Sequence, residues 1–362
     1  MGDKFIKDHI QRIKPYEPVI PIDVLSNELG IPVDQLIKLD ANENPYGMPP
    51  TAQKNLGNLL LGHIYPDPEA RYLKERLAEV LGIPFSNIVV GAGSDELIDL
   101  IMRMTGGPGE KVINCPPTFG FYKANAQVNN FDVIEVRRKP DFSLDFPEIE
   151  KAVEEGAKLI FLANPNNPDG SLIPLRVLNQ ILSLPTLVVI DEAYIEFAQG
   201  YPSLVPEVLQ RDNLIVLRTF SKWGGLAGLR LGYGIFPEAL ARAIMKIKQP
   251  YNVSVSASQA GLGALEDLDL LNERANKMIL ERERLMERLK SLDYLSPYPT
   301  NTNFILIKVI VGDAYQIQQA LIERGILIRY FNTPGLDDHI RISIGKPEDN
   351  NQLLAALEDL QP

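Results

Sequence analysis

The chain has 362 residues, a formal net charge of −11 and a hydrophobic fraction of 45%. This acidic balance argues against nucleic acid or an anionic membrane surface as the main partner, and no apolar run is long enough to span a bilayer. The single cysteine, Cys115, excludes an intrachain disulfide, and the polar N-terminal stretch shows no signal peptide, so we expect a cytoplasmic protein with more than one domain.

Short apolar runs alternate with helical patterns through the middle of the chain. This alternation predicts an α/β domain with a mostly parallel central sheet and helices on both faces, which we assign to residues 39–255. The predicted strands lie at residues 87–90, 111–114, 158–162, 187–190, 214–217 and 231–235, and the clearest helices between them at 95–104 and 175–182.

The pattern changes after about residue 254. A long amphipathic helix is predicted first, and shorter elements follow it. The helix lies at residues 270–292, and after it come a strand at 303–309, a helix at 314–324, strands at 326–330 and 339–344, and a closing helix at 347–360. These elements predict a smaller α+β domain, built from residues 256–362 together with residues 1–38, whose N-terminal stretch packs across it.

Polar or glycine-rich segments follow four of the predicted strands. Ligands in open α/β sheets bind beyond the carboxyl ends of the strands, so these segments are candidates for a binding site. The first, GAGSDE at residues 91–96, opens a helix whose free backbone N–H groups could hold a phosphate, although a plain strand-to-helix connection explains it equally well. Glu96 stands where a dinucleotide-binding fingerprint requires its third glycine.

The next two strand ends carry an amide and a carboxylate. Asn167 precedes Pro168 in the segment NPNNPDG, which is either a pair of turns or a rigid support for an amide that bonds a ligand. Asp191 ends the apolar run 187–190, where a carboxylate either caps the next element or meets the cation of a ligand.

The fourth segment, TFSKWGGLAGLRLGYG at residues 219–234, places one lysine after an apolar run. On its own, Lys222 is best explained as a solvated loop lysine, but a second cation such as Arg230 beside it would lower its pKa. A phosphate-binding turn, an aspartate, a tyrosine, and a lysine beside an arginine are together the parts of a pyridoxal phosphate site. Aspartate keeps the pyridine nitrogen protonated and lysine carries the aldehyde, so the combination predicts this cofactor.

Nine motifs occur along the chain in a specific order. They are DANENP (40–45), YPDP (65–68), GAGSDE (91–96), CPPTFGFY (115–122), NPNNPDG (164–170), DEAYIEF (191–197), TFSKWGGLAGLRLGYG (219–234), GILIRYF (325–331) and RISIG (341–345). In these residues and their order, the chain resembles the fold-type-I pyridoxal-phosphate aminotransferases over nearly its whole length. The resemblance implies a large cofactor-binding domain, a smaller α+β domain and the transfer of an amino group.

The resemblance also implies the catalytic roles. Lys222 would carry the cofactor and move protons, and Asp191 would pair with the pyridine nitrogen. Tyr194 and Asn167 would hydrogen-bond the 3′-oxygen. Phe119 would stack over the ring, in a position where tyrosine is common.

Further residues match those that hold the cofactor phosphate. Tyr65 matches a tyrosine that reaches this phosphate from the neighbouring subunit, so the resemblance implies a homodimer with shared active sites. The residues expected from the same subunit are Ser94, Asp95, Thr219, Ser221 and Arg230.

The substrate residues follow from the same resemblance. Arg341 matches the arginine that binds a carboxylate of glutamate or 2-oxoglutarate, and Arg329 the arginine associated with the phosphate end of histidinol phosphate. Tyr16 and Asn44 complete the expected substrate contacts. The implied reaction belongs to histidine biosynthesis and interconverts histidinol phosphate and 2-oxoglutarate with imidazole acetol phosphate and glutamate. One departure from the common motif is Asp169, which stands in the place of a threonine.

Other functions stay open on the same residues. A threonine-phosphate decarboxylase or an aromatic amino acid aminotransferase would use Lys222 and Asp191 in the same way. A nicotinamide-dependent oxidoreductase is disfavoured by the missing third glycine, and a non-catalytic binding protein by the presence of both the lysine and the aspartate. The three histidines do not have the spacing of metal ligands, so we expect no metal site.

Overall fold

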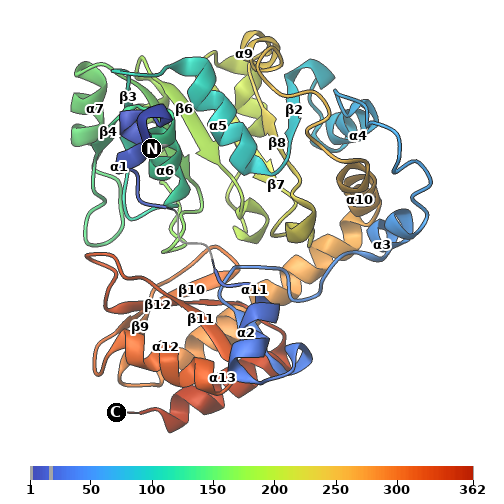
Figure 1. Cartoon of the computed structure of the whole chain (residues 1–362). Helices are drawn as coiled ribbons and strands as arrows, with labels where there is room; N and C mark the ends of the chain where they lie inside the picture. The colour runs from blue at the N-terminus through green and yellow to red at the C-terminus, as the bar shows by residue number, and fades with distance from the viewer. Residues whose placement is uncertain (1–2, 16–18, 362) are drawn as a thin grey trace.

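The computed structural model of the protein describes residues 3–15 and 19–361. It has two lobes, each built on its own sheet (Figure 1). Neighbouring strands of the larger sheet pair in parallel, except that β8 is antiparallel to both β2 and β7. The expected mostly parallel α/β sheet is therefore confirmed. The strand order is β2 (Ile88–Gly91), β8 (Gly232–Ile235), β7 (Leu214–Thr219), β6 (Leu187–Asp191), β5 (Ala157–Ala163), β3 (Lys111–Asn114) and β4 (Asp132–Glu135).

Helices cover both faces of this sheet because its strands direct alternate apolar side chains into two separate cores. Along β6, Val189 belongs to one core, while Val188 and Ile190 belong to the other. The first core is closed by α5 (Ser94–Thr105), α6 (Phe121–Val128) and α9 (Glu238–Ile244). The second core is closed by α4 (Arg71–Leu81), α7 (Phe146–Glu154) and α8 (Leu175–Leu182).

The smaller lobe is built from segments near both ends of the chain. Its β1, from near the N-terminus, pairs in parallel with β11, and the remaining pairs of neighbours are antiparallel. The strand order is β1 (Ile37–Leu39), β11 (Ile326–Tyr330), β12 (His339–Ser343), β10 (Phe304–Val309) and β9 (Leu295–Pro297). The accompanying helices are α2 (Ile22–Leu29), α12 (Ala314–Glu323) and α13 (Pro347–Asp359) (Figure 1).

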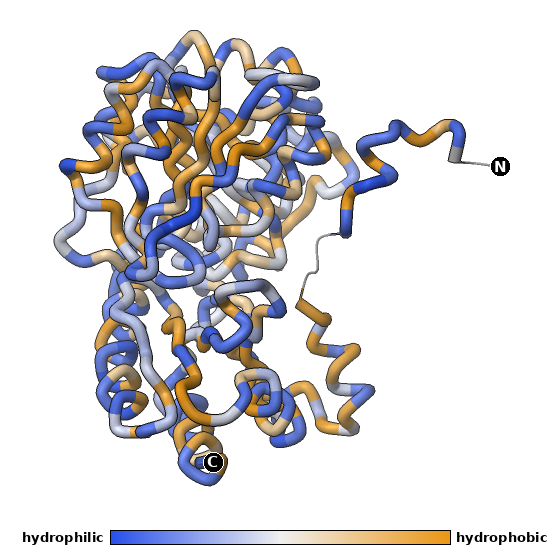
Figure 2. Tube along the Cα trace, turned by 90° about the vertical axis from the view of Figure 1, so that its left-hand side faces the viewer, coloured by the Kyte–Doolittle hydropathy of each residue, from blue (hydrophilic) through white to orange (hydrophobic). Residues whose placement is uncertain are grey.

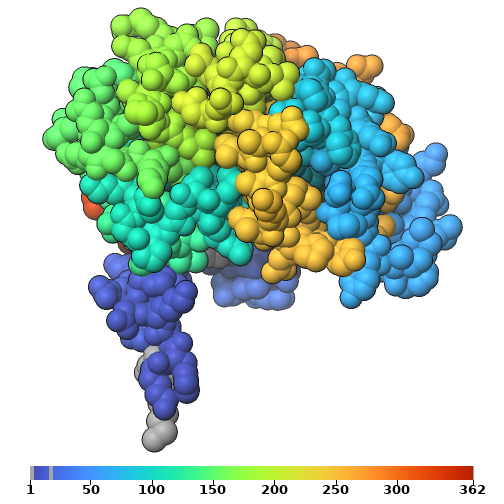
Figure 3. Space-filling model, turned by 90° about the horizontal axis from the view of Figure 1, so that it is seen from above, coloured from blue at the N-terminus to red at the C-terminus, as the bar shows by residue number. Residues whose placement is uncertain are grey.

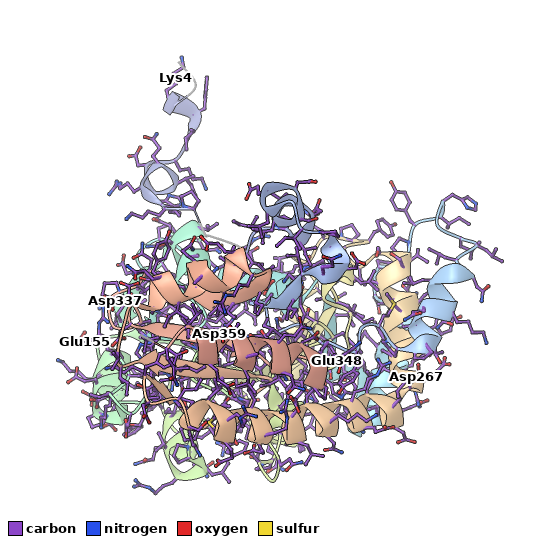
Figure 4. All side chains as sticks on the ribbon, turned by 90° about the horizontal axis from the view of Figure 1, so that it is seen from below. Lys4, Glu155, Asp267, Asp337, Glu348 and Asp359 are labelled. Atoms are coloured by element: carbon purple, nitrogen blue, oxygen red, sulfur yellow. The ribbon has the colours of Figure 1, made fainter. Side chains whose placement is uncertain are left out.

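One long helix, α11 (Leu268–Lys290), connects the lobes (Figure 1). It follows α10 (Val255–Glu266), which packs closely on α3 (Pro50–Gly57), since a Cβ on Gly263 would lie 2.6 Å from the backbone nitrogen of Ala52. Asp267 lies between α10 and α11, beside α3 (Figure 4), and accepts hydrogen bonds from the backbone N–H and the hydroxyl of Thr51, both at 2.8 Å. The start of α11 is thereby fixed to the larger lobe.

The N-terminal segment lies apart from the smaller lobe. Its α1 (Asp8–Arg12) contacts α6 of the larger lobe, where the Nε2 atom of His9 is 3.2 Å from the carbonyl oxygen of Val128. The residues that precede α1 project from the body of the molecule, with Lys4 near the far end (Figures 2, 3 and 4). The division of the chain at residues 38 and 255 stays a prediction; β1 belongs to the smaller sheet, while α1 contacts the larger lobe. Within the described residues, we find no helix that combines the length and the apolar character needed to cross a membrane.

The elements predicted from the sequence are confirmed with small shifts at their ends. The sequence pattern does not reveal β4, because only two residues of its DVIE run are apolar. It also misses α10, whose alanine, serine and glycine residues give no clear polar face.

Candidate active site

A cleft of about 1550 Å³ lies where the strands of the larger sheet end. Its wall includes residues that close β3, β5, β6 and β7, together with residues of β11 and β12 from the smaller lobe. The carboxyl ends of the parallel strands thus bring the segments singled out in the sequence to one place. Most of the predicted site residues line this cleft: Ser94, Asp95, Phe119, Asn167, Asp191, Tyr194, Thr219, Ser221, Lys222, Arg230, Arg329 and Arg341.

One end of the cleft is built to accept an anion. α5 begins at Ser94, after Gly93 with φ +81°, so the unpaired N–H groups of its first turn lie at the cleft wall. Gly232 on β8 allows this approach, because a Cβ there would lie 2.3 Å from the backbone nitrogen of Ser94. The guanidinium of Arg230 donates to Asp95 at 2.6 Å and adds positive charge beside the helix N-terminus. Helix dipole and arginine together favour a phosphate.

Two hydroxyl side chains extend this anion site. Thr219 is the last residue of β7, and Ser221 comes two residues later. Both are buried in the cleft wall. The backbone N–H of Ser221 donates to the Thr219 hydroxyl at 3.0 Å, which fixes that side chain. Each hydroxyl can donate a hydrogen bond to an anionic ligand.

Lys222 enters the cleft directly after these hydroxyls. Its Nζ donates to the carbonyl oxygen of Ala41 at 2.8 Å and lies 6.0 Å from the centre of the Tyr194 ring. Desolvation lowers the pKa of Lys222 to about 8, and the positive charge of Arg341 acts in the same direction. About a tenth of this amine is therefore uncharged at pH 7, the form that a nucleophile or a base requires.

Asp191 is a buried carboxylate at the end of β6. It accepts hydrogen bonds from the hydroxyl of Tyr122 at 2.7 Å and from the backbone N–H of Ala193 at 3.1 Å. Desolvation raises its pKa to about 6 even though both hydrogen bonds oppose the rise. Within residues 3–15 and 19–361, no cationic side chain forms an ion pair with Asp191, so its charge is suited to a cationic ligand group.

Polar side chains of both lobes form hydrogen bonds with one another at the cleft. The hydroxyl of Tyr194 accepts a hydrogen bond from the amide of Asn42 at 3.1 Å. Arg341, on β12, donates to the side-chain oxygen of Asn167 and to the carbonyl oxygen of Asp40, both at 2.7 Å. The arginine thus connects the two lobes at the cleft.

Arg329 and Phe119 also line the cleft. Arg329, on β11, forms no hydrogen bond or ion pair with any residue that the structure describes, so its guanidinium can bind a ligand. Phe119 is half-buried and packs edge-to-face on Tyr122, with ring centres 5.4 Å apart. It offers a flat apolar surface to a ring bound in the cleft.

Two predicted site residues that the structure describes, Tyr65 and Asn44, do not line this cleft. Tyr65 is 80% exposed and stacks on Tyr251, so its expected role in a neighbouring subunit stays a prediction. Asn44 donates its amide to the carbonyl oxygen of Trp223 and stabilises a turn there. Tyr16 falls outside the described residues.

The structure adds two residues that sequence reasoning did not single out. Asn42 lines the cleft and bonds Tyr194, while Tyr122 bonds Asp191. Both belong to motifs recognised in the sequence, DANENP and CPPTFGFY, but only their partners in space identify their roles.

The arrangement fits a phosphorylated pyridine aldehyde. The α5 terminus with Arg230 accepts a phosphate, Asp191 accepts a protonated ring nitrogen, and Lys222 presents an amine to an aldehyde. Pyridoxal phosphate carries all three groups. Among the residues that the structure defines, we find no cluster of His, Cys, Asp and Glu that could hold a metal ion.

Comparison with known sequences places the chain in a family. A family model described as "Aminotransferase class I and II" matches residues 34–357. A protein of Nicotiana tabacum named histidinol-phosphate aminotransferase, chloroplastic, is 48% identical over 99% of this chain and 87% of its own length. A histidinol-phosphate aminotransferase of Roseiflexus castenholzii is 45% identical over 98% of both chains.

Comparison with solved structures agrees. The crystal structure of histidinol-phosphate aminotransferase from Sinorhizobium meliloti in complex with pyridoxal 5′-phosphate has a TM-score of 0.89 and 31% sequence identity, covering 98% of this chain and 96% of that one. The structure of an L-threonine-O-3-phosphate decarboxylase from Porphyromonas gingivalis is also similar, with a TM-score of 0.79 and 25% identity over 90% of this chain and 99% of that one. The chain therefore belongs to the class I and II aminotransferase family and, within it, to the group of the histidinol-phosphate aminotransferases.

Proposed function

We propose that this transaminase binds pyridoxal phosphate and transfers an amino group between histidinol phosphate and 2-oxoglutarate, a reversible step of histidine biosynthesis that yields imidazole acetol phosphate and glutamate. The observation that carries the proposal is that one cleft contains both Lys222, with a pKa of about 8, and the buried carboxylate of Asp191. Relatives of that name, at 45–48% identity over nearly the whole chain, support the choice of substrates.

The cofactor supplies an electron sink that acidifies the proton on the substrate carbon that bears the amine. Asp191 would hold the ring nitrogen in its protonated form, because the buried carboxylate gains a cation that it otherwise lacks. Tyr122 keeps that carboxylate in place through its 2.7 Å hydrogen bond. The first turn of α5 and Arg230 would hold the phosphate.

Lys222 would move the proton. Its Nζ, uncharged in part near neutral pH, accepts a proton from the amine-bearing carbon of the substrate. The Tyr194 ring lies beside the amine, with its centre 6.0 Å from Nζ, and Asn42 holds the hydroxyl of Tyr194 through a hydrogen bond.

Two arginines of the smaller lobe would select the substrates. Arg341 would bind a carboxylate of 2-oxoglutarate or glutamate, and Arg329 the phosphate of histidinol phosphate. A site that offers two guanidinium groups favours substrates with an anionic group remote from the amine.

We further propose a homodimer in which Tyr65 completes the neighbouring active site. Tyr65 is exposed and outside the cleft of its own chain, as a residue that serves a second subunit would be. Mixing an inactive Lys222→Ala subunit with an inactive Tyr65→Ala subunit should restore activity, because one site of the mixed dimer has both residues intact. Mixed dimers as inactive as the parents would exclude shared sites.

The visible absorbance spectrum of the cofactor-loaded protein tests the main proposal. Histidinol phosphate should bleach the cofactor band, and 2-oxoglutarate should restore it. Threonine phosphate serves as the control amine, with carbon dioxide release measured in parallel. A band that responds to threonine phosphate with release of carbon dioxide, and not to histidinol phosphate, would refute the proposed reaction.

A further inference from the structure

The two substrate arginines form an unusual pair. Arg329 of β11 and Arg341 of β12 lie directly opposite each other in the antiparallel register, and both line the cleft. Like charges directly opposite in a sheet destabilise it, because their side chains lie on the same face a few ångströms apart. A neighbouring group that interacts with both guanidinium groups would offset this repulsion while no substrate is bound.

The Phe331 ring is in position to do this. Phe331 comes two residues after Arg329 and directly follows the end of β11. The centre of its ring is 5.9 Å from the Cζ atom of Arg329 and 5.7 Å from the Cζ atom of Arg341. Both distances are within the range of a cation–π contact. One aromatic ring therefore contacts both guanidinium groups.

The ring is itself held in place. Phe331 packs against a small apolar cluster that includes Phe142, Leu306 and Leu336. The guanidinium of Arg341 also contacts a second ring, that of Phe304, with its Cζ atom 5.1 Å from the ring centre.

The two guanidinium groups have different surroundings. Arg341 is held at Asn167 and Asp40, each at 2.7 Å. The guanidinium of Arg329 has no hydrogen bond or ion pair to any described residue, so its contact with Phe331 is an interaction that can orient it. Loss of the ring should therefore affect Arg329 most.

We propose that Phe331 is a positioning residue that holds Arg329 and Arg341 as two separate anion-binding groups, so that one cleft accepts the phosphate of one substrate and the carboxylate of the other. This inference rests on the proposed function for the identity of the two substrates. The ring does not touch the reacting atoms, so its removal acts on substrate binding rather than on proton transfer.

Two substitutions distinguish the effect of the aromatic face from the effect of side-chain volume. Phe331→Leu keeps an apolar side chain but removes the aromatic face, and Phe331→Tyr keeps the face. We expect Phe331→Leu to raise KM for histidinol phosphate about tenfold and KM for 2-oxoglutarate by a smaller factor, with kcat within about twofold of wild type. Phe331→Tyr should restore KM to near the wild-type value. Leu306→Val, which disturbs the same apolar cluster without removing a ring, serves as the packing control and should leave both KM values unchanged.

A binding measurement keeps this test independent of the proposed reaction. The dissociation constant of inorganic phosphate for the cofactor-loaded protein, measured by calorimetry, should rise about tenfold in Phe331→Leu and not in Phe331→Tyr. An unchanged constant in Phe331→Leu, an equal loss in both variants, or a fall in kcat at constant KM would overturn the role of Phe331. If wild type binds phosphate but does not act on histidinol phosphate, the proposed function fails, while the phosphate constants of the variants still decide the role of the ring.

Discussion

Replacing Asp191 by asparagine should stabilise the cofactor-free protein while it removes activity. Burial raises the pKa of this carboxyl from 3.8 to about 6, which at ~1.36 kcal/mol per pH unit corresponds to about 3 kcal/mol of unfolding free energy lost at neutral pH. Asparagine carries no charge; its side-chain oxygen can still accept the hydrogen bond from the backbone N–H of Ala193, and its NH2 group can donate to the Tyr122 hydroxyl, which is able to accept. The variant should therefore recover most of this free energy.

The gain depends on pH in a defined direction. Below about pH 4 the carboxyl is protonated in both the folded and the unfolded chain, so Asp191→Asn should change stability little. Between pH 4 and 6 the unfolded chain releases the proton and the folded chain retains it, so the wild-type protein loses stability as the pH rises. Above about pH 6 the penalty is complete, and the advantage of the variant should be constant at about 3 kcal/mol.

Denaturant unfolding of the two cofactor-free proteins at pH 5, 6, 7 and 8 measures this difference, at one protein concentration because a dimer would shift the midpoint. Addition of pyridoxal phosphate should reverse the order, since only the wild-type carboxylate gains a cation from the ring. A variant that is no more stable than wild type at pH 8, or a difference that does not vary with pH, would refute the reasoning.

The remaining predictions concern single side chains. Lys222→Ala should lower turnover about 10³-fold, because it removes the group that moves the proton, and full activity would exclude the mechanism. Circular dichroism should show an intact fold, because the lost ammonium is poorly solvated and makes one hydrogen bond. Gly232→Ala should raise the dissociation constant of pyridoxal phosphate at least about tenfold in a fluorescence titration, because its Cβ displaces Ser94; unchanged binding would show that the α5 terminus does not hold the phosphate. Arg138 is buried near the buried carboxylate of Asp169, and Arg138→Met should destabilise the protein by about 2 kcal/mol in denaturant unfolding, because it removes the positive charge that interacts with this carboxylate. In an Asp169→Thr background the same substitution should cost less stability; equal losses in the two backgrounds would show that the charges do not interact.

The sequence could predict where the site lies because its markers follow consecutive strands. Asp191, Asn167 and Lys222 each come after an apolar run, and parallel strands end at one edge of a sheet. Their roles, in contrast, depended on the resemblance, since each residue alone also fits a turn, a cap or a surface position.

Residue partners far apart in the chain could not be predicted in this way. The DANENP motif contains two asparagines, and pattern alone does not tell which one faces the cleft. In the structure Asn42, with φ +56°, directs its amide to Tyr194, whereas Asn44 stabilises a turn at Trp223. The hydrogen bond between Tyr122 and Asp191 joins residues separated by 69 positions, and no local periodicity reports such a pair.

The pairing of β1 with β11 has a consequence for folding during synthesis. Ile37 pairs with Ile326, which is synthesised 289 residues later. At common translation rates, β1 therefore has no partner strand for roughly 15–60 s. The larger lobe can fold meanwhile, because its strands and their neighbours lie between these two segments. Until β11 is synthesised, the apolar side chains of β1 have no sheet to pack into, so β1 is a binding site for a chaperone that recognises short extended apolar segments. A nascent chain that stops before residue 326 would keep that segment exposed and become a substrate for proteolysis.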